Sequence, residues 1–293
     1  MHKFLRAIGF STLYKRGELK NTLRSVLRNP TYKQYVSLND DSIAVEYRRE
    51  FANGIGIAVC GEYSDDVEFD YEYYYPYFVG TSISTSEDVT VERHAEKESY
   101  AGVCEDNRIG VTLIFYLQNR MDYMKEQMGN RLPEQNTSVS LSGLALNGSI
   151  MLPLKKNPKQ LQAKKKADHK RDLLMTAARQ GDENAIESLT LDDIDMYSML
   201  SRKILDEDVF TLVDTYFMPY GIECDQYSIL GEIVEVAEAL NELTKETIYI
   251  ITMNCNDLIF DICINKKDLV GEPAAGRRFK GIIWLQGHIN FPE

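Results

Sequence analysis

The residues best suited to bind a ligand lie near the end of the chain: Arg277, Arg278, Lys280, Trp284 and His288. Arginines and an aromatic ring on one face of a strand can bind single-stranded nucleic acid by ion pairing and base stacking. One aromatic ring makes a small stacking platform, however. We therefore favour a structural role, in which Trp284 packs in the core and the arginines pair with nearby acids.

A second group of candidates could hold a metal ion. Asp65, Asp70 and Glu72 belong to an acidic stretch in which alternate residues of a strand are carboxylates. Carboxylates two residues apart on a strand point the same way, which suits coordination of a hard divalent cation. The solvated face of a half-buried sheet explains the same pattern, and we favour that interpretation.

The sequence carries no signature of a familiar catalytic or cofactor site. None of the four histidines lies near a cysteine or a second histidine at metal-ligand spacing, and no G-x-S-x-G turn is present. The loop 271–278 has the glycine spacing of a phosphate-binding loop but lacks its Lys-Ser/Thr pair. We expect no cofactor and lean against an enzyme, although catalytic groups can also assemble in space.

A basic segment, residues 155–171, carries eight basic residues against one acid, Asp168. Subtracting these from the 33 basic and 45 acidic residues of the chain leaves 25 and 44, a formal charge of −19. That charge opposes a nucleic-acid tether, and no apolar wedge supports membrane insertion. We predict a loose, salt-sensitive strap that joins two parts of the chain and lies along its acidic surface or stays mobile.

Composition limits the function further. The chain has 293 residues and a net charge of −12, which disfavours a general nucleic-acid binder. No apolar stretch approaches the ~20 residues that a membrane-spanning helix needs, and the start does not read as a signal peptide. The five cysteines show no C-x-x-C spacing, so reduced, buried thiols are expected, without a disulfide-linked partner. We therefore expect a cytoplasmic protein without a membrane partner.

Hydrophobic periodicity predicts an N-terminal α+β domain, residues 1–154. A helix over 15–27 precedes short strands joined by turns, which favours antiparallel pairing. The strands fall at 42–46, 54–60, 67–75, 89–93, 99–104 and 109–117. A second helix over 117–128 and a closing strand over 138–146, with a bulge near Gly143, complete the domain.

The rest of the chain divides into a basic linker (155–171), a helical connector (172–219) and a small C-terminal β-domain (220–293). In the connector, helices end at Gly181 and begin at Asp182. The final strands fall at 227–236, 247–254, 258–265 and 280–286, an order compatible with an OB-like barrel. The predicted fold class is therefore α+β, with an antiparallel sheet and packed helices, a helical connector and a small β-domain.

Three motifs carry a resemblance. They are Met1-His2-Lys3-Phe4-Leu5-Arg6-Ala7-Ile8-Gly9-Phe10, the turn Met218-Pro219-Tyr220-Gly221, and the stretch from Gly276 to Gly287. Over its whole length the chain resembles an uncharacterised bacterial family, a domain of unknown function found chiefly in anaerobic Gram-positive species. The resemblance implies a bacterial cytoplasmic setting and transfers no activity or catalytic residue.

These observations favour a cytoplasmic, non-enzymatic interaction or regulatory module whose partner is another protein. Two alternatives stay open. The acidic strand 65–72 could serve a metal-dependent enzyme, and the C-terminal strands could form an OB-like binder of single-stranded nucleic acid.

Overall fold

The computed structural model describes residues 2–12, 16–38, 42–63, 69–93, 99–132, 137–153, 166–167, 170–171, 173–178, 180–191 and 213–292. The chain folds into two compact units. The larger unit contains Met1–Met151 and Tyr216–Glu293, and the smaller contains Leu152–Thr215. The larger unit therefore combines segments from both sides of an insertion.

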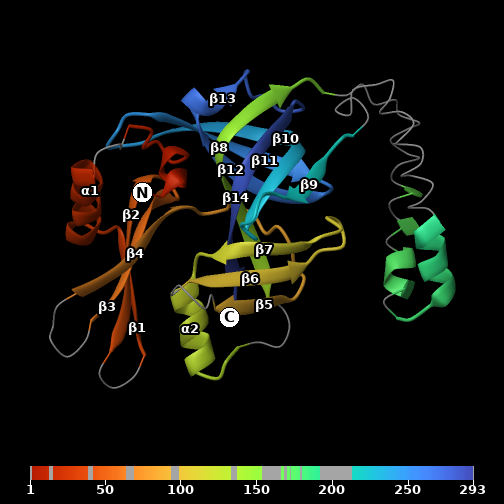
Figure 1. The fold of residues 1–293 in the computed structure, drawn as a ribbon, viewed down its shortest axis with the longest axis horizontal. Helices are drawn as coiled ribbons and strands as arrows, with labels where there is room; N and C mark the ends of the chain where they lie inside the picture. Colours follow the sequence, from red (N-terminus) through yellow and green to blue (C-terminus); the bar gives the residue numbers. More distant parts are fainter. Residues whose placement is uncertain are drawn as a thin grey trace. The chain divides into compact units, whose positions relative to one another are not determined.

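A four-stranded antiparallel sheet forms one part of the larger unit (Figure 1). Its strands follow the chain order, with β1 at one edge and β4 at the other. They are β1 (Tyr32–Ser37), β2 (Ile43–Ala52), β3 (Ile55–Tyr63) and β4 (Phe69–Phe78). Helix α1 (Arg16–Arg28) precedes the sheet, and its apolar stripe of Leu19, Leu23, Val26 and Leu27 packs into the same core as the sheet.

A closed five-stranded barrel forms the other part. Its strands are β8 (Ser138–Met151), β12 (Leu258–Asn265), β11 (Thr247–Cys255), β10 (Gln226–Leu240) and β14 (Arg278–Asn290), in that order around the barrel. Strand β14 pairs antiparallel with β8 over its whole length, and this pairing closes the barrel. The pairing of β8 with β12 is parallel, and the remaining pairings are antiparallel.

Shorter elements extend the barrel. The end of β14 pairs in parallel with β7 (Thr112–Leu117), which continues the sheet to β6 (Tyr100–Glu105) and β5 (Val89–Arg93). Strand β9 (Tyr216–Pro219) pairs with β10, and β13 (Leu269–Val270) with β8. The helices α2 (Arg120–Met128), η1 (Lys3–Arg6) and η2 (Lys266–Asp268) complete the unit.

Two hydrophobic cores hold the larger unit together. Alternate residues of all five barrel strands, such as Ile251, Ile262 and Ile283, point inward and form the first core. Residues on the opposite face of the same strands, including Leu144 and Trp284, join the four-stranded sheet and residues 4–10 in the second core. The N-terminal segment therefore packs with both the sheet and the outside of the barrel.

Glycines make room for aromatic rings in the barrel wall. The Phe279 ring occupies the space where side chains on Gly148 and Gly281 would lie. A side chain on Gly287 would likewise overlap the ring of Phe115. Glycine in a strand weakens the strand itself, but here it allows a large ring to lie flat against the backbone.

The predicted α+β class is wrong, because the structure is mostly β. Several strands and helices were predicted within a few residues of their observed bounds: β5 matches 89–93, and α2 lies within 117–128. The grouping of these elements into domains was predicted wrongly. Among the described residues, helices do not form a layer of a separate N-terminal domain, and strands from both sides of the insertion form the barrel.

The prediction of a small C-terminal β-domain with an OB-like barrel is wrong, because β8 is one of the barrel strands. The barrel needs this strand from before the insertion, so residues 220–293 do not close it alone. The predicted division at residues 154 and 220 therefore separates strands that pair in one barrel. The expected bulge in β8 exists, but the register shifts at Leu146 and not at Gly143.

The smaller unit is helical where it is described, over 173–178 and 183–191. Gly181 has φ +88°, and Asp182 Oδ1 accepts hydrogen bonds from the backbone N–H groups of Asn184 and Ala185 at 2.9 and 3.3 Å. The predicted helix end and start are thus confirmed. The strap prediction concerns 155–171, most of which lies outside the described residues. Within the described part of the chain, no helix is long and apolar enough to cross a membrane.

Candidate functional site

The five candidate binding residues near the C-terminus do not form one site. Arg278, Lys280, Trp284 and His288 all lie on β14, where ten residues of strand span roughly 33 Å. Arg277 precedes the strand and donates a hydrogen bond to the carbonyl of Glu272 at 2.6 Å. Arg278 is buried, with 6% of its surface exposed. The structure therefore places these side chains in separate environments along one long strand.

Trp284 is a core residue. It is 5% exposed, and its ring lies 5.3 Å from the ring of Phe4 and 4.8 Å from that of His2. Its indole N–H donates a hydrogen bond to Asp225 at 2.7 Å. A buried ring that packs against neighbouring rings and is hydrogen-bonded at its polar edge offers no surface on which a base could stack.

Lys280 lines a shallow groove on the outside of the barrel, with a volume of about 300 Å³. Its walls are otherwise small or neutral: Asn147, Gly148, Ser149, Ser228, Gly281 and Ile282. One lysine among amide and hydroxyl groups gives weak selectivity for any ligand, so this groove is not the strongest candidate site.

His288 borders a buried polar cluster between the barrel and the four-stranded sheet. Arg48 donates hydrogen bonds to Glu46 Oε1 at 2.7 Å and to the carbonyl of Gln118 at 2.5 Å. Tyr75 donates to Glu46 Oε2 at 2.8 Å. Burial opposes the charge of Arg48, but Glu46, Tyr75 and Tyr77 together outweigh burial and hold the pKa of Arg48 above its usual value. Burial and the nearby Arg48 lower the pKa of His288.

This cluster joins the sheet to the barrel. The Gln118 side chain donates to the carbonyl of Phe78 at 2.7 Å and to Gln286 at 2.8 Å, which links β4, β7 and β14. Cys60 lies beside Glu46 and is fully buried, and burial raises the pKa of its thiol. A buried thiol with a raised pKa is a poor nucleophile, so the cluster has a structural character.

The candidate metal ligands are only partly described. Asp70 and Glu72 lie exposed on β4, whereas Asp65 lies outside the described residues. No group of three or more His, Cys, Asp or Glu side chains that could hold a metal ion occurs among the residues that the structure describes.

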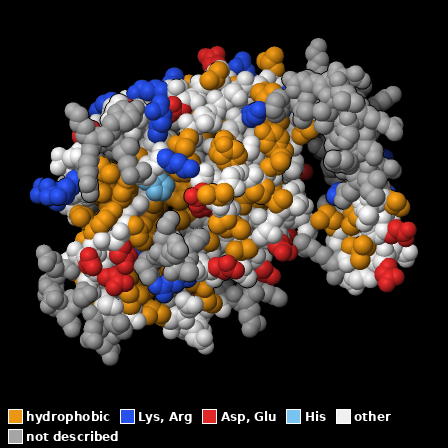
Figure 2. All heavy atoms as spheres, viewed as in Figure 1, with side chains coloured by type: hydrophobic (Ala, Val, Ile, Leu, Met, Phe, Trp, Pro, Cys, Tyr) orange, Lys and Arg blue, Asp and Glu red, His pale blue; other side chains and the backbone are white. Residues whose placement is uncertain are grey.

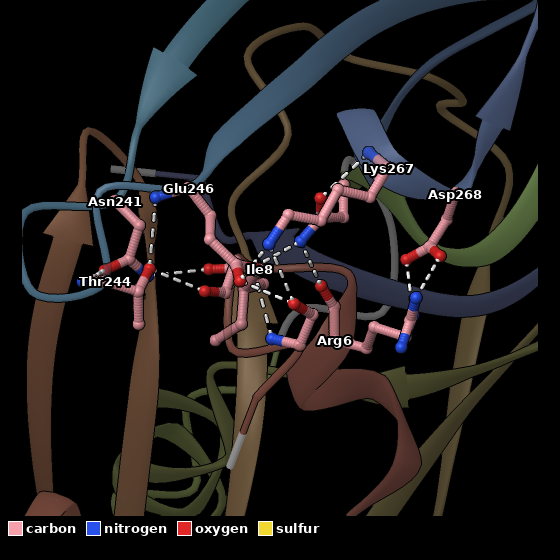
Figure 3. Close-up of polar contacts among 10 residues, drawn as sticks. Arg6, Ile8, Asn241, Thr244, Glu246, Lys267 and Asp268 are labelled. Atoms are coloured by element: carbon pink, nitrogen blue, oxygen red, sulfur yellow. Dashed lines mark hydrogen bonds and ion pairs between the residues drawn. The ribbon is translucent and has the colours of Figure 1, made fainter.

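A polar clamp, drawn in Figure 3, fixes the N-terminal segment to the barrel. Glu246 accepts hydrogen bonds from Ser11 Oγ at 2.5 Å, Asn265 Nδ2 at 2.6 Å and Lys267 Nζ at 2.7 Å. Asn241 donates to the carbonyl of Ile8 at 2.8 Å. Burial raises the pKa of Glu246, but these donors outweigh burial and lower it.

The clamp contains a serine beside a lysine, a pair that can form a nucleophile. Such a pair needs a neutral amine that accepts the proton of the hydroxyl. Here the Ser11 hydroxyl donates its hydrogen bond to Glu246 and not to an amine, and Glu246 also forms an ion pair with the ammonium of Lys267. Arg6 forms a further ion pair with Asp268 at 2.5 Å. The arrangement therefore anchors a chain segment.

Among the described residues, an exposed surface of the four-stranded sheet takes no part in the polar cluster or the clamp. We call it the aromatic face. It lies on one side of the four-stranded sheet, because directly opposed residues of paired strands point the same way. It consists of Lys33, Tyr35, Ile43, Tyr63, Phe69 and Tyr71. Tyr35, Tyr71 and Ile43 are 67%, 44% and 41% exposed.

Contacts among the rings hold the aromatic face in place. The hydroxyl groups of Tyr47 and Tyr63 lie 2.8 Å apart, and the Phe69 ring meets both rings at 5.4 and 5.5 Å. The hydrogen bond with Tyr47, followed by burial, raises the pKa of Tyr63. Lys33 Nζ lies over the rings of Tyr47 and Tyr63 at 4.8 and 5.7 Å.

Figure 2 shows a broad band of hydrophobic side chains on the side of the molecule where the four-stranded sheet lies, with acidic side chains at one end of that band. Strand β1 was not predicted from the sequence, and Lys33 and Tyr35 were therefore not among the candidate binding residues. The signal was present in residues 32–37, where Gln34 and Val36 alternate with Lys33 and Tyr35.

Residues 5–287 match the family described as "Domain of unknown function, E. rectale Gene description (DUF3881)". The chain belongs to this family. The resemblance of the two chain ends to an uncharacterised bacterial family is thus confirmed. No curated protein and no solved structure matches the chain.

The DUF3881 match extends across both units. It includes the clamp residues Arg6 and Glu246, the aromatic face and most of β14. The matched region of this chain therefore includes the sheet, the barrel and the insertion together.

Proposed function

We propose that this protein is a non-enzymatic interaction or regulatory module that binds another protein through its aromatic face. The observation that carries the proposal is the exposure of Tyr35, Tyr71 and Ile43 on one side of a single small sheet. Each exposed ring or aliphatic chain leaves apolar surface in water, and a partner that covers it gains roughly 25 cal/mol per Å².

Tyrosine suits this role for physical reasons. Its ring supplies a large contact area with few rotatable bonds, and its hydroxyl accepts or donates a hydrogen bond at the rim of an interface. The Tyr47, Tyr63 and Phe69 contacts fix the centre of the face before a partner arrives. A rigid surface loses little conformational entropy on binding.

The proposal includes a cytoplasmic setting. Its support is that all five cysteines are free, and four of them are buried. Reduced thiols are the normal state in the cytoplasm.

Affinity capture with defined variants tests the proposed function. The wild-type chain and a Tyr35→Ser, Tyr71→Ser variant are used as bait in native lysate. Tyr220→Ser is the matched control, since Tyr220 is a tyrosine of similar exposure, 45%, outside the aromatic face. We expect the face variant to lose the captured protein and the control to retain it. Equal capture by all three baits would overturn the proposal.

A further inference from the structure

We propose that the partner is an acidic, extended segment that adds as a fifth strand to the open edge of β1. This inference rests on the proposed function and specifies the partner of the same surface. Its basis is the coincidence of three features among the described residues: a strand edge that pairs with no further strand, a lysine without a carboxylate partner, and a run of basic residues that leads into the same strand.

The free edge comes from the sheet topology. Among the described residues, β1 pairs with β2 and with no other strand, and Figure 1 shows it at the border of its sheet. Alternate residues of an edge strand direct their backbone N–H and C=O groups away from the sheet, where another strand can pair with them. Tyr32 and Tyr35 on this strand are 51% and 67% exposed, so its side chains leave room for a neighbour.

The lysine is Lys33, the second residue of β1. Its ammonium lies over two tyrosine rings and forms no ion pair with a carboxylate of the described residues. A ring–ammonium contact leaves most of the ammonium surface open to a carboxylate. The exposed lysines Lys266 and Lys267, in contrast, each pair with a glutamate of the barrel.

The chain segment that leads into β1 is basic, although the protein as a whole is acidic. Residues 16–33, which form α1 and the start of β1, hold five basic residues and one acid, Glu18. The side chain of Arg49 on β2 points to the same side of the sheet as Lys33. Arg49 donates a hydrogen bond to the carbonyl of Ser25 in α1 at 3.1 Å, so α1 also lies on that side. The net charge of the whole chain is −12, so residues 16–33 are positively charged in a protein that is acidic as a whole.

These features select one kind of occupant. A strand that pairs with β1 places every second side chain beside Lys33 and Tyr35. A carboxylate at such a position completes the ion pair of Lys33, and an apolar side chain on the other face lies on the side of β1 where Val36 packs against Met121 and Met124 of α2. A second copy of β1 would bring another lysine to this edge, and like charges across a strand pair repel. The geometry therefore favours an acidic segment over self-association.

The first experiment measures binding of a short fluorescent peptide of alternating valine and glutamate by polarisation. The same peptide with lysine in place of glutamate is the charge control. We expect the glutamate peptide to bind, the lysine peptide not to bind, and Lys33→Glu to weaken binding about tenfold. Lys266→Glu is the matched control variant, since Lys266 Nζ also lies over a tyrosine ring, at 5.1 Å from that of Tyr249. It should bind as the wild type does.

The second experiment tests pairing of the backbone. N-methylation of alternate amides removes the donors on one edge of the glutamate peptide, and we expect binding to be lost. Hydrogen exchange of the unmodified complex should show new protection in residues 32–37. Equal binding of both peptide charges, an unchanged affinity of Lys33→Glu, or protection confined to another element would overturn the proposed partner.

The two proposals can fail separately. If capture depends on Tyr35 and Tyr71 while the glutamate peptide does not bind, the acidic-strand partner is wrong and the interaction function stands. If capture is also independent of these tyrosines, both proposals fall.

Discussion

Replacement of Glu246 by glutamine is the sharpest test of how the N-terminal segment is held. Glu246 Oε2 accepts from the backbone N–H of Ser11 at 3.2 Å and from Asn265 Nδ2 at 2.6 Å. Its Oε1 accepts from Ser11 Oγ and from Lys267. A glutamine has one oxygen, so its NH₂ group must face donors at the other position. Asn265 cannot turn to help, because its oxygen already accepts from Lys267 N at 3.0 Å.

The cost follows from the bonds that are lost. A hydrogen bond to a charged group contributes about 1.5–3 kcal/mol, and two such bonds to the buried carboxylate are lost or reversed. Lys267 is 56% exposed and adds little. We expect Glu246→Gln to lower the free energy of unfolding by about 3 kcal/mol at neutral pH. Glu238→Gln is the matched control, because Glu238 also pairs with a lysine but is 53% exposed, and it should cost about 0.5 kcal/mol or less.

The fluorescence of Trp284 can be used to follow release of the N-terminal segment. Trp284 is the single tryptophan, and Phe4 and His2 of the clamped segment stack on it, so its fluorescence reports release of that segment. Urea unfolding is followed by this fluorescence and by circular dichroism. The lowered pKa of Glu246 means that its stabilisation is present above the usual pKa of 4.5 and is lost as the pH falls through the lowered value. Equal unfolding midpoints for Glu246→Gln and Glu238→Gln would refute this account of the clamp.

Three further perturbations follow from the same structure. The pKa of His288 is lowered from 6.5, so the folded state loses stability as the pH falls below about 6.5, and His288→Gln should flatten the thermal midpoint between pH 7 and 5. Gly287→Ala places a methyl group on the Phe115 ring and should cost about 1–3 kcal/mol in urea unfolding, with part recovered by adding Phe115→Leu. Arg48→Met leaves Glu46 buried without its ion pair and should cost about 3–5 kcal/mol, and adding Glu46→Gln should restore part of the melting temperature if the unpaired charge is the cause.

Local elements could be read from the sequence, because their signals are local. The strand predicted over 258–265 coincides with β12, since every second residue from Leu258 to Ile264 is apolar and turn residues precede the strand. The helix start at Asp182 was also correct, because a capping aspartate acts within three residues of its own position.

Pairing between distant strands could not be read in this way. Both β8 and β14 mix apolar residues with glycine and polar residues, and nothing in either sequence identifies the other strand as its partner across the insertion. The candidate site was limited by the same fact. The clamp joins Ser11 to Glu246, 235 residues away, so no pattern of residue spacing in the sequence predicts this contact. Trp284 and His288 were found because of their residue types, but their burial depends on the sheet that packs against β14.

The order of the barrel strands along the chain has a consequence for synthesis. Strand β8 ends at Met151, while its partner β14 ends at Asn290. At a rate of about 5–20 residues per second, the ribosome needs roughly 7–30 s to make the residues between these points. During that time β8 and the outer strands that depend on β14 expose unpaired edges and apolar faces. We expect this nascent chain to bind a chaperone until the last strand emerges, and ribosome-bound chains that stop before residue 278 to be sensitive to protease throughout β8.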